Sequence, residues 1–126
     1  MSKKRYYTRG QMEADISDAV TRFEKEYMGR GPLETKTYII DDMIITRLRG
    51  VLTKAEMKLI KSERKSKGRD LIKQVRIELL ESGRAILEAA IRSITKIKIR
   101  TLHTDISTTV GEKVIIFILE KPVEFD

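Results

Sequence analysis

Apolar residues recur at helical spacing in three parts of the chain. From about Gln11 to Met28 an apolar side chain returns every three or four residues, which predicts a helix with one buried face. Gly29–Pro32 ends this helix, because glycine readily adopts the left-handed conformation and proline cannot continue a helix. Thr53–Glu56 has the pattern of a capping box, so a short helix is expected to begin there and to end near Ser62.

The third and longest helix is expected from about Gly68 to Thr95. Its apolar positions form a wide stripe of the kind that faces a core. The stripe consists of Leu71, Ile72, Val75, Leu79, Leu80, Ile86, Leu87, Ala90, Ile91 and Ile94. Ser82 and Gly83 interrupt it, which indicates either a bend or a close contact with another helix.

Two hairpins separate these helices. Thr35–Ile40 and Met43–Arg49 alternate between the two faces of a strand, and Asp41–Asp42 joins them as a turn, which explains this acidic pair better than a cation site does. The last hairpin is expected to comprise about Lys96–Thr109 and Lys113–Lys121. Both hairpins therefore contribute antiparallel strands.

The first arm of the last hairpin changes face part-way along. Apolar positions up to Ile99 lie on one face and those from Leu102 on the other, a shift that a β-bulge near Arg100 or Thr101 would produce. The second arm is apolar on both faces from Val114 to Leu119, which is typical of a central strand.

The predicted order is α-β-β-α-α-β-β. Hairpins separated by helices favour an α+β fold, a two-layer sandwich in which a four-stranded antiparallel sheet carries helices on one face. We expect a basic flexible tail over residues 1–9, one α+β domain over residues 10–122 and a C-terminal tail over residues 123–126.

Positive charge is concentrated in two short segments. The net charge of the chain is +7. Residues 3–9 and residues 61–69 each carry a net charge of +4, so the rest of the chain is close to neutral. The excess charge is therefore expected in a tail and a loop and not on the folded body.

Composition limits the chemistry and the compartment. The chain has no cysteine, which excludes disulfides, thiolate metal sites and a thiol nucleophile. No apolar stretch approaches the ~20 residues that span a bilayer, and the basic N-terminus has no apolar segment behind it. We expect a soluble cytoplasmic protein, and the family resemblance described below implies that such a protein could lie peripheral to the membrane. Its isoleucine-rich, highly charged composition is typical of thermophiles.

Four spaced segments together resemble a known family. They are Phe23–Pro32, Lys36–Met43, Arg47–Thr53 and Leu102–Thr108. In this order they resemble the MpsC-type family of small bacterial proteins, which is named for a sodium-translocating, membrane-potential-generating system. The resemblance covers about residues 11–121. It implies association with a membrane system, and it brings no catalytic residues to this chain.

The sole histidine lies in the last hairpin and marks a candidate polar site. The site comprises His103, Thr104, Asp105 and Ser107. A neutral imidazole acts as a base or a metal ligand, and Asp105 is expected on the same strand face as His103. One histidine and one carboxylate make a poor metal site, because zinc takes three or four protein ligands. A polar strand face that bonds to the backbone or to a partner subunit is favoured, and neither a metal nor a cofactor is expected.

Positive side chains form a candidate anion-binding set. Arg30 offers a guanidinium fork within the turn that ends the first helix, although a simple helix stop explains that turn as well. The basic loop adds five cations. The full set is Arg30, Lys61, Arg64, Lys65, Lys67 and Arg69. Such a set suits a polyanion, either nucleic acid or anionic lipid, although most charge runs are only solvated.

Three functional hypotheses remain at this stage. The first is a non-enzymatic interaction protein, expected to be a homodimer, whose helix-free sheet face docks a copy of itself or a partner. As the resemblance implies, it serves as an accessory to a membrane ion-transport or membrane-potential system. The second is a nucleic-acid-binding regulator, because Lys3–Tyr7 interleaves cations with aromatic residues as single-strand binders do. The third is an enzyme centred on His103 and Asp105.

Overall fold

The computed structural model describes residues 8–61 and 65–125, with seven helices and strands in the predicted order. The elements are α1 (Arg9–Tyr27), β1 (Glu34–Ile40), β2 (Met43–Arg49), α2 (Lys54–Ile60), α3 (Lys65–Thr95), β3 (Ile99–Ser107) and β4 (Glu112–Leu119). The predicted α-β-β-α-α-β-β order is confirmed.

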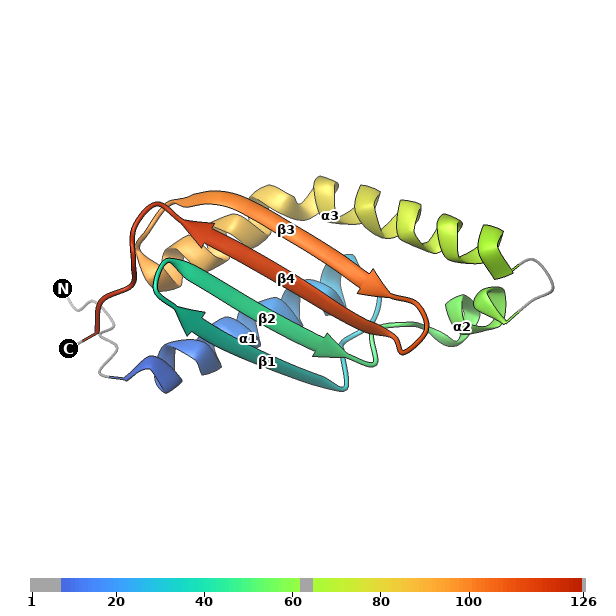
Figure 1. Ribbon diagram of the computed structural model, residues 1–126, viewed down its shortest axis with the longest axis horizontal. Coiled ribbons are helices and arrows are strands. Elements are labelled where there is room, and N and C mark those ends of the chain that lie inside the picture. The colour runs from blue at the N-terminus through green and yellow to red at the C-terminus, as the bar shows by residue number, and fades with distance from the viewer. Residues whose placement is uncertain (1–7, 62–64, 126) are drawn as a thin grey trace.

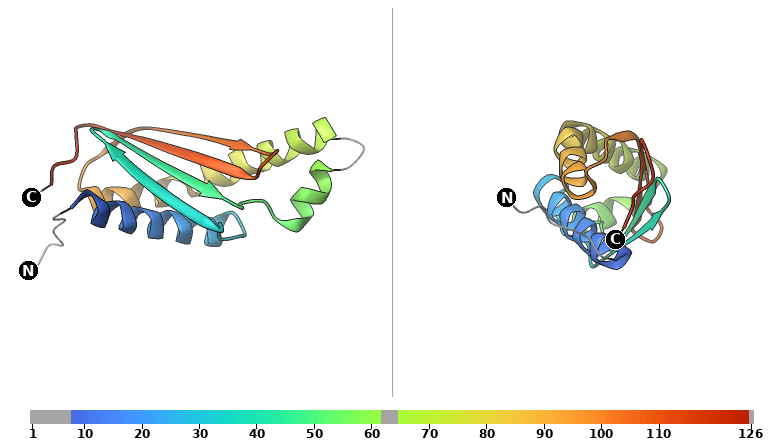
Figure 2. Two further views of the ribbon diagram at one scale, coloured as in Figure 1. Left: turned by 60° about the horizontal axis from the view of Figure 1, so that its bottom comes forward. Right: turned by 90° about the vertical axis from the view of Figure 1, so that its left-hand side faces the viewer.

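The four strands form one antiparallel sheet in the order β1-β2-β4-β3. Helices α1 and α3 lie on the same face of this sheet (Figures 1 and 2). Within the described residues no helix covers the opposite face, which we call the outer face. The predicted two-layer α+β fold is therefore confirmed, and β4 is a central strand as expected.

Local signals in the sequence set the ends of the helices. A capping box of Thr8 and Gln11 starts α1, two residues earlier than expected, and Gly29 follows its end with a φ of 85°. The capping box of Thr53 and Glu56 starts α2 as predicted. In both boxes the threonine hydroxyl accepts a hydrogen bond from a backbone N–H that the helix itself leaves unsatisfied.

The strand pairing confirms the predicted bulge. The register between β3 and β4 shifts between Ile99 and Thr101. After the shift, Leu102 pairs with Phe117 and both side chains are buried under the helices. Without the extra residue, the apolar side chains beyond it would face away from the core.

The core lies between the inner face of the sheet and the two long helices. Its fully buried apolar members are Ile16, Val20, Ile44, Leu48, Leu87, Ile91, Ile115, Phe117 and Leu119. Hydroxyl groups join α1 to the sheet beside this core, since Ser17 bonds to Thr37 at 2.8 Å and Thr37 to Thr46 at 3.1 Å. These bonds satisfy polar groups that burial would otherwise leave unpaired.

The apolar stripe of α3 is only partly buried, in contrast to the prediction. Leu71, Val75 and Ile86 are about half exposed, whereas Leu87 and Ile91 are fully buried. With 31 residues α3 is about 46 Å long, whereas β3 with nine residues spans only about 30 Å. The N-terminal part of α3 therefore extends past the sheet (Figure 1), and the stripe is wider than the core.

Gly83 makes the close helix contact that the interruption of the stripe indicated. A Cβ atom at this position would lie 2.8 Å from the ring of Phe23 and 2.9 Å from the ring of Tyr27. These two rings stack on each other, with centroids 5.1 Å apart. Only glycine lets α3 approach this aromatic pair of α1 so closely.

Replacing Gly83 with valine should force α1 and α3 apart. We expect the free energy of unfolding to fall by about 2 kcal/mol, the typical cost of overpacking a closely packed contact. Urea denaturation measures this loss. Ala85→Val, at an exposed position of the same helix, is the control and should change stability by only about 0.5 kcal/mol. Equal effects of the two substitutions would contradict this account of the helix contact.

Candidate functional site

The candidate polar site lies on the edge strand β3, where Thr104 and Asp105 border a small cavity and His103 does not. His103 and Asp105 share the outer face, as the alternation predicts. Both are exposed, and the Nε2 atom of His103 lies 3.2 Å from the Thr101 hydroxyl. Asp105 is 86 % exposed and pairs with Lys73 at 3.9 Å. His103 lines neither of the two cavities described below.

The outer face has an apolar end and a charged end. Two cross-strand rows make up the apolar end: Tyr38, Ile45 and Ile116 in one, Ile40, Met43 and Ile118 in the other. At the charged end opposite charges are paired, since Arg47 lies 2.9 Å from Glu112, and Arg49 lies 2.9 Å from Glu34. This face therefore presents apolar surface beside a nearly neutral charged border.

A groove of about 680 Å³ lies at the end of the molecule where three loops meet. The loops are those between α1 and β1, between β2 and α2, and between β3 and β4, and the facing ends of α2 and α3 complete it. We call it the end groove. Its apolar floor consists of Leu33, Leu52, Met57, Ile60 and Val110.

The end groove brings together half of the candidate anion-binding set. Arg30, Lys61 and Arg69 come from three different segments, and all three line the groove. Lys67 is exposed and lies outside the lining. Arg64 and the side chain of Lys65 fall outside the described residues. None of the twelve described lining residues is acidic.

Hydrogen bonds hold the loops of the end groove together. The backbone N–H of Leu33 donates to Arg49 at 2.8 Å, and that of Val51 donates to Gly111 at 3.2 Å. The Nη1 group of Arg30 donates to the carbonyl of Leu52 at 3.2 Å. The groove is therefore a fixed feature of the fold and not a gap between independent loops.

A buried ion pair crosses the core beside this end of the molecule. The Nζ atom of Lys113 on β4 lies 2.8 Å from Oε2 of Glu24 on α1, and the side chains are 4 % and 0 % exposed. This pair was not predicted from the sequence. Side chains of a strand alternate between its two faces, which places Lys113 on the same face as the core residues Ile115 and Phe117. That alternation could have indicated that Lys113 is buried.

A second buried cation continues the network into α2. Arg76 on α3 is 5 % exposed and forms a two-pronged contact with Glu56, at 2.8 Å and 3.0 Å. Its Nη2 group also donates to the carbonyl of Val51 at 2.7 Å. Among the described residues, no partner lies within hydrogen-bonding distance of Arg76 Nη1 or Glu24 Oε1. Neither the burial of Arg76 nor its bond to Glu56 was predicted from the sequence.

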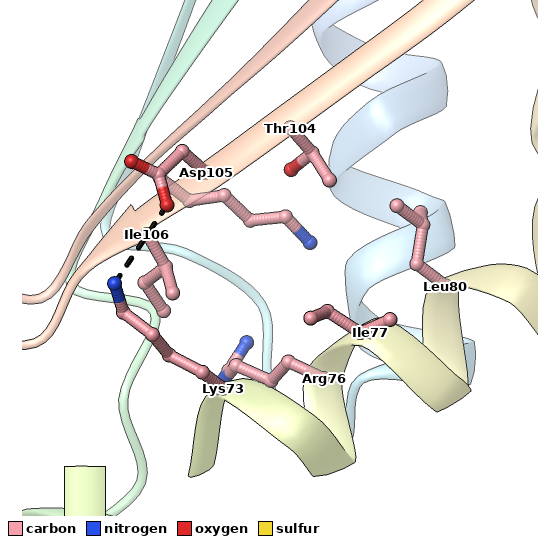
Figure 3. Close-up of a pocket in the computed structure, with 8 residues that line it drawn as sticks. Lys73, Arg76, Ile77, Leu80, Thr104, Asp105 and Ile106 are labelled. Atoms are coloured by element: carbon pink, nitrogen blue, oxygen red, sulfur yellow. Dashed lines mark ion pairs between the residues drawn. The ribbon is translucent and has the colours of Figure 1, made fainter. Parts of the chain in front are cut away.

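The second cavity lies between α3 and β3 and is small. Figure 3 shows Lys73, Arg76 and Ile77 of α3 facing Thr104 and Asp105 of β3. Its volume of about 70 Å³ suits a few water molecules. The Lys73–Asp105 ion pair lies at its rim (Figure 3).

Comparison with known proteins gives the family. A sequence profile described as the Na+-translocating membrane potential-generating system (MpsC) matches residues 8–121. The chain belongs to the MpsC family. An uncharacterized protein of Bacillus subtilis (strain 168), YbcI, is 43 % identical over 117 residues, which cover 93 % of this chain and 92 % of that protein. No solved structure matches the chain.

The described part of this MpsC chain lacks two kinds of feature. None of the helices in the described ranges has the length and apolar character needed to cross a membrane. Within the same ranges, no three acidic or histidine side chains come together in a way that could hold a metal ion.

Burial and ion pairing shift the pKa values of Lys113 and Glu56 in this MpsC chain. Burial lowers the pKa of Lys113, and the charge of Glu24 and its hydrogen bond offset this only in part. For Glu56 burial acts to raise the pKa, but the hydrogen bonds from Arg76 and Thr53 outweigh it and leave the pKa below 4.5. Glu56 therefore stabilises the fold in its charged form.

Replacing Glu56 with glutamine should remove a stabilisation that depends on pH. Because the pKa of Glu56 is lowered in the fold, its contribution is complete above pH 4.5 and is lost as the pH falls through the folded-state pKa. We expect Glu56→Gln to lower the free energy of unfolding by about 3 kcal/mol near neutral pH, because Arg76 loses its charged partner. Urea denaturation between pH 7 and pH 3 measures the difference, which should shrink below pH 4.5.

The matched control for this prediction is Glu81→Gln. Glu81 pairs with Arg84 at 3.2 Å on the exposed surface of α3. Exposed pairs contribute little, so this substitution should change stability by less than about 1 kcal/mol. A pH-independent effect of Glu56→Gln would show that the charge of Glu56 is not what stabilises the fold.

Proposed function

We propose that this MpsC-family chain is a non-enzymatic interaction protein that forms a homodimer and serves a bacterial membrane ion-transport or membrane-potential system. The observation that carries this proposal is the apolar end of the outer face. Tyr38 and Ile40 are 44 % and 54 % exposed there, and they adjoin partly buried apolar side chains of β2 and β4. Contiguous exposed apolar surface of this kind marks protein interaction sites.

The outer face fits a second copy of itself. A two-fold interface joins the same patch on both subunits, so it needs a surface without excess charge of one sign. The paired charges of Arg47 with Glu112 and Arg49 with Glu34 meet this requirement. Strand spacings give the face a projected area of about 440 Å². A copy stacked on it therefore forms an interface in the small range typical of reversible association.

The arrangement of the polar site supports a role without catalysis. General acid–base chemistry needs a base within hydrogen-bond reach of a bound reactant, in a site that holds the reactant. His103 and Asp105 project from an open strand face and border no shared cavity. In the proposed dimer they lie at the margin of the interface, where they contribute hydrogen bonds.

The link to a membrane system rests on the family description together with the distribution of charge. The matching family is described as a Na+-translocating membrane potential-generating system. Lys61, Lys67 and Arg69 are exposed around the start of α3, at the opposite end of the molecule from the C-terminus (Figure 1). We place this basic end against acidic segments of a membrane protein, with the chain in the cytoplasm and peripheral to the membrane.

Substituting Ile40 with lysine should dissociate the proposed dimer. A charge within the apolar end has no partner in the interface, and its burial is costly. Size-exclusion chromatography with light scattering should show wild type approaching twice 14.6 kDa as concentration rises, with the variant monomeric throughout. Ile86→Lys, at a position of α3 that is exposed to a similar extent, should still dimerise. Dimerisation lost only in Ile86→Lys would move the interface to α3.

Photo-crosslinking in native membranes tests the partner. A photoreactive residue in place of Lys67, at the basic end, should link the chain to a subunit with membrane-spanning segments. The same residue in place of Lys98, which is exposed at the far end of the molecule, should not. The same unrelated soluble proteins captured from both positions would refute the membrane link. Nucleic acid captured from Lys67 would favour a nucleic-acid-binding regulator instead.

A further inference from the structure

The end groove combines exposed apolar side chains with a volume that suits a small molecule. Its apolar floor includes Leu33 and Val110, which are 77 % and 70 % exposed. Its volume of about 680 Å³ lies within the range of roughly 300–1,000 Å³ that small-molecule sites occupy. Leaving such side chains in contact with water is unfavourable, so an apolar occupant would gain free energy on entering the groove.

The charge around the groove is of one sign. Arg30, Lys61 and Arg69 line it, and no acidic residue does within the described part of the chain. Across the same part of the chain, neither Lys61 nor Arg69 forms a salt bridge with a carboxylate. Some cations elsewhere on this protein surface are paired with carboxylates, as Arg47, Arg49 and Arg84 are. The groove thus offers cations to an anion that comes from outside the chain.

The groove is built before any ligand arrives. Leu52, which lines the groove, and the neighbouring Val51 are held by the buried Arg76, by Gly111 and by Arg30 through hydrogen bonds of 2.7–3.2 Å. Leu33 packs directly over Gly50, where an added Cβ would lie 2.6 Å from the leucine side chain. A preorganised site binds more tightly, because its side chains and loops lose little conformational entropy on binding.

We propose that the end groove binds one molecule of an anionic amphiphile. A carboxylate or phosphate headgroup lies against Arg30, Lys61 and Arg69, and an alkyl chain lies along the apolar floor. Guanidinium and ammonium groups bond both headgroups in the same way. This site is separate from the outer face, so the inference does not depend on the proposed dimer. It shares Lys61 and Arg69 with the basic end that we place against a membrane protein, so the amphiphile and that protein would compete for these two cations.

The lining argues against nucleic acid as the occupant. Binding of single strands depends on aromatic side chains on which bases stack. None of the described lining residues is aromatic. An acidic peptide would satisfy the cations, but backbone amides placed against the floor would lose hydrogen bonds to water. An alkyl chain carries no such cost.

Calorimetry with three twelve-carbon amphiphiles, each below its micellar concentration, tests the proposal. Dodecanoate and dodecyl phosphate should bind one to one at low salt. Dodecyltrimethylammonium, with the same chain and a cationic headgroup, should bind at least tenfold more weakly. Equal binding of all three would refute the role of the cations, and no binding of either anion would refute the site.

Matched substitutions locate the binding. Arg69→Gln should weaken dodecanoate binding about fivefold, the factor typical of one partly exposed ion pair. Arg100→Gln, at an exposed position of β3 outside the groove, should leave it unchanged. Val110→Ser should weaken binding, and Val75→Ser, which also changes an exposed valine, should not. Equal effects within either pair would overturn the assignment to this groove.

A vesicle experiment identifies the source of the amphiphile. Vesicles of phosphatidylglycerol carrying a trace of radiolabelled palmitate are mixed with the protein and removed by sedimentation. Transfer of palmitate into the soluble protein fraction, lost in Arg69→Gln but not in Arg100→Gln, is the expected result. Sedimentation of the protein with the vesicles without transfer would mean that the groove binds a bilayer surface, which contradicts a site for a single molecule.

Discussion

The buried ion pair between Glu24 and Lys113 joins the first helix to the last strand of the fold. Both side chains are almost completely shielded from water, so each charge depends on the other to offset the free energy lost on leaving water. Neither charge is satisfied until α1 lies against β4 in the native register. A neutral pair of similar size would hold the layers together without requiring that register. The charged pair therefore selects one packing of helix on sheet.

Arg76, the second buried cation, extends this constraint to the end groove. The pKa of Lys113 is lowered first by burial, and the nearby charge of Arg76 lowers it further. Arg76 in turn holds α2 through Glu56 and the loop after β2 through Val51. The walls of the end groove therefore depend on a charge network that lies behind them. Helix α2 has no buried residue, so this polar link contributes much of what keeps it in place.

Local patterns predicted the elements, and long-range contacts account for what the sequence did not reveal. The capping box at Thr53 and the bulge next to Thr101 depend on neighbours along the chain, and both were predictable. Glu24 and Lys113 are 89 residues apart in the chain, and the local sequence around either residue does not indicate that the other is its partner. Arg30, Lys61 and Arg69 were recognised as cations, but only the fold brings them to one groove. The apolar floor went unnoticed because its five members come from three distant stretches of the chain, at Leu33, Leu52–Ile60 and Val110.

The position of β4 in the sheet has a consequence for synthesis on the ribosome. This strand pairs with both β2 and β3, yet it is the last strand of the domain to be made. Until it emerges, the β1–β2 hairpin has an open inner edge, and long-range pairing must wait for its partner. A nascent chain stalled before residue 112 would therefore carry helices and a hairpin with no completed sheet. Such an intermediate is a natural substrate for chaperones that shield unpaired strands.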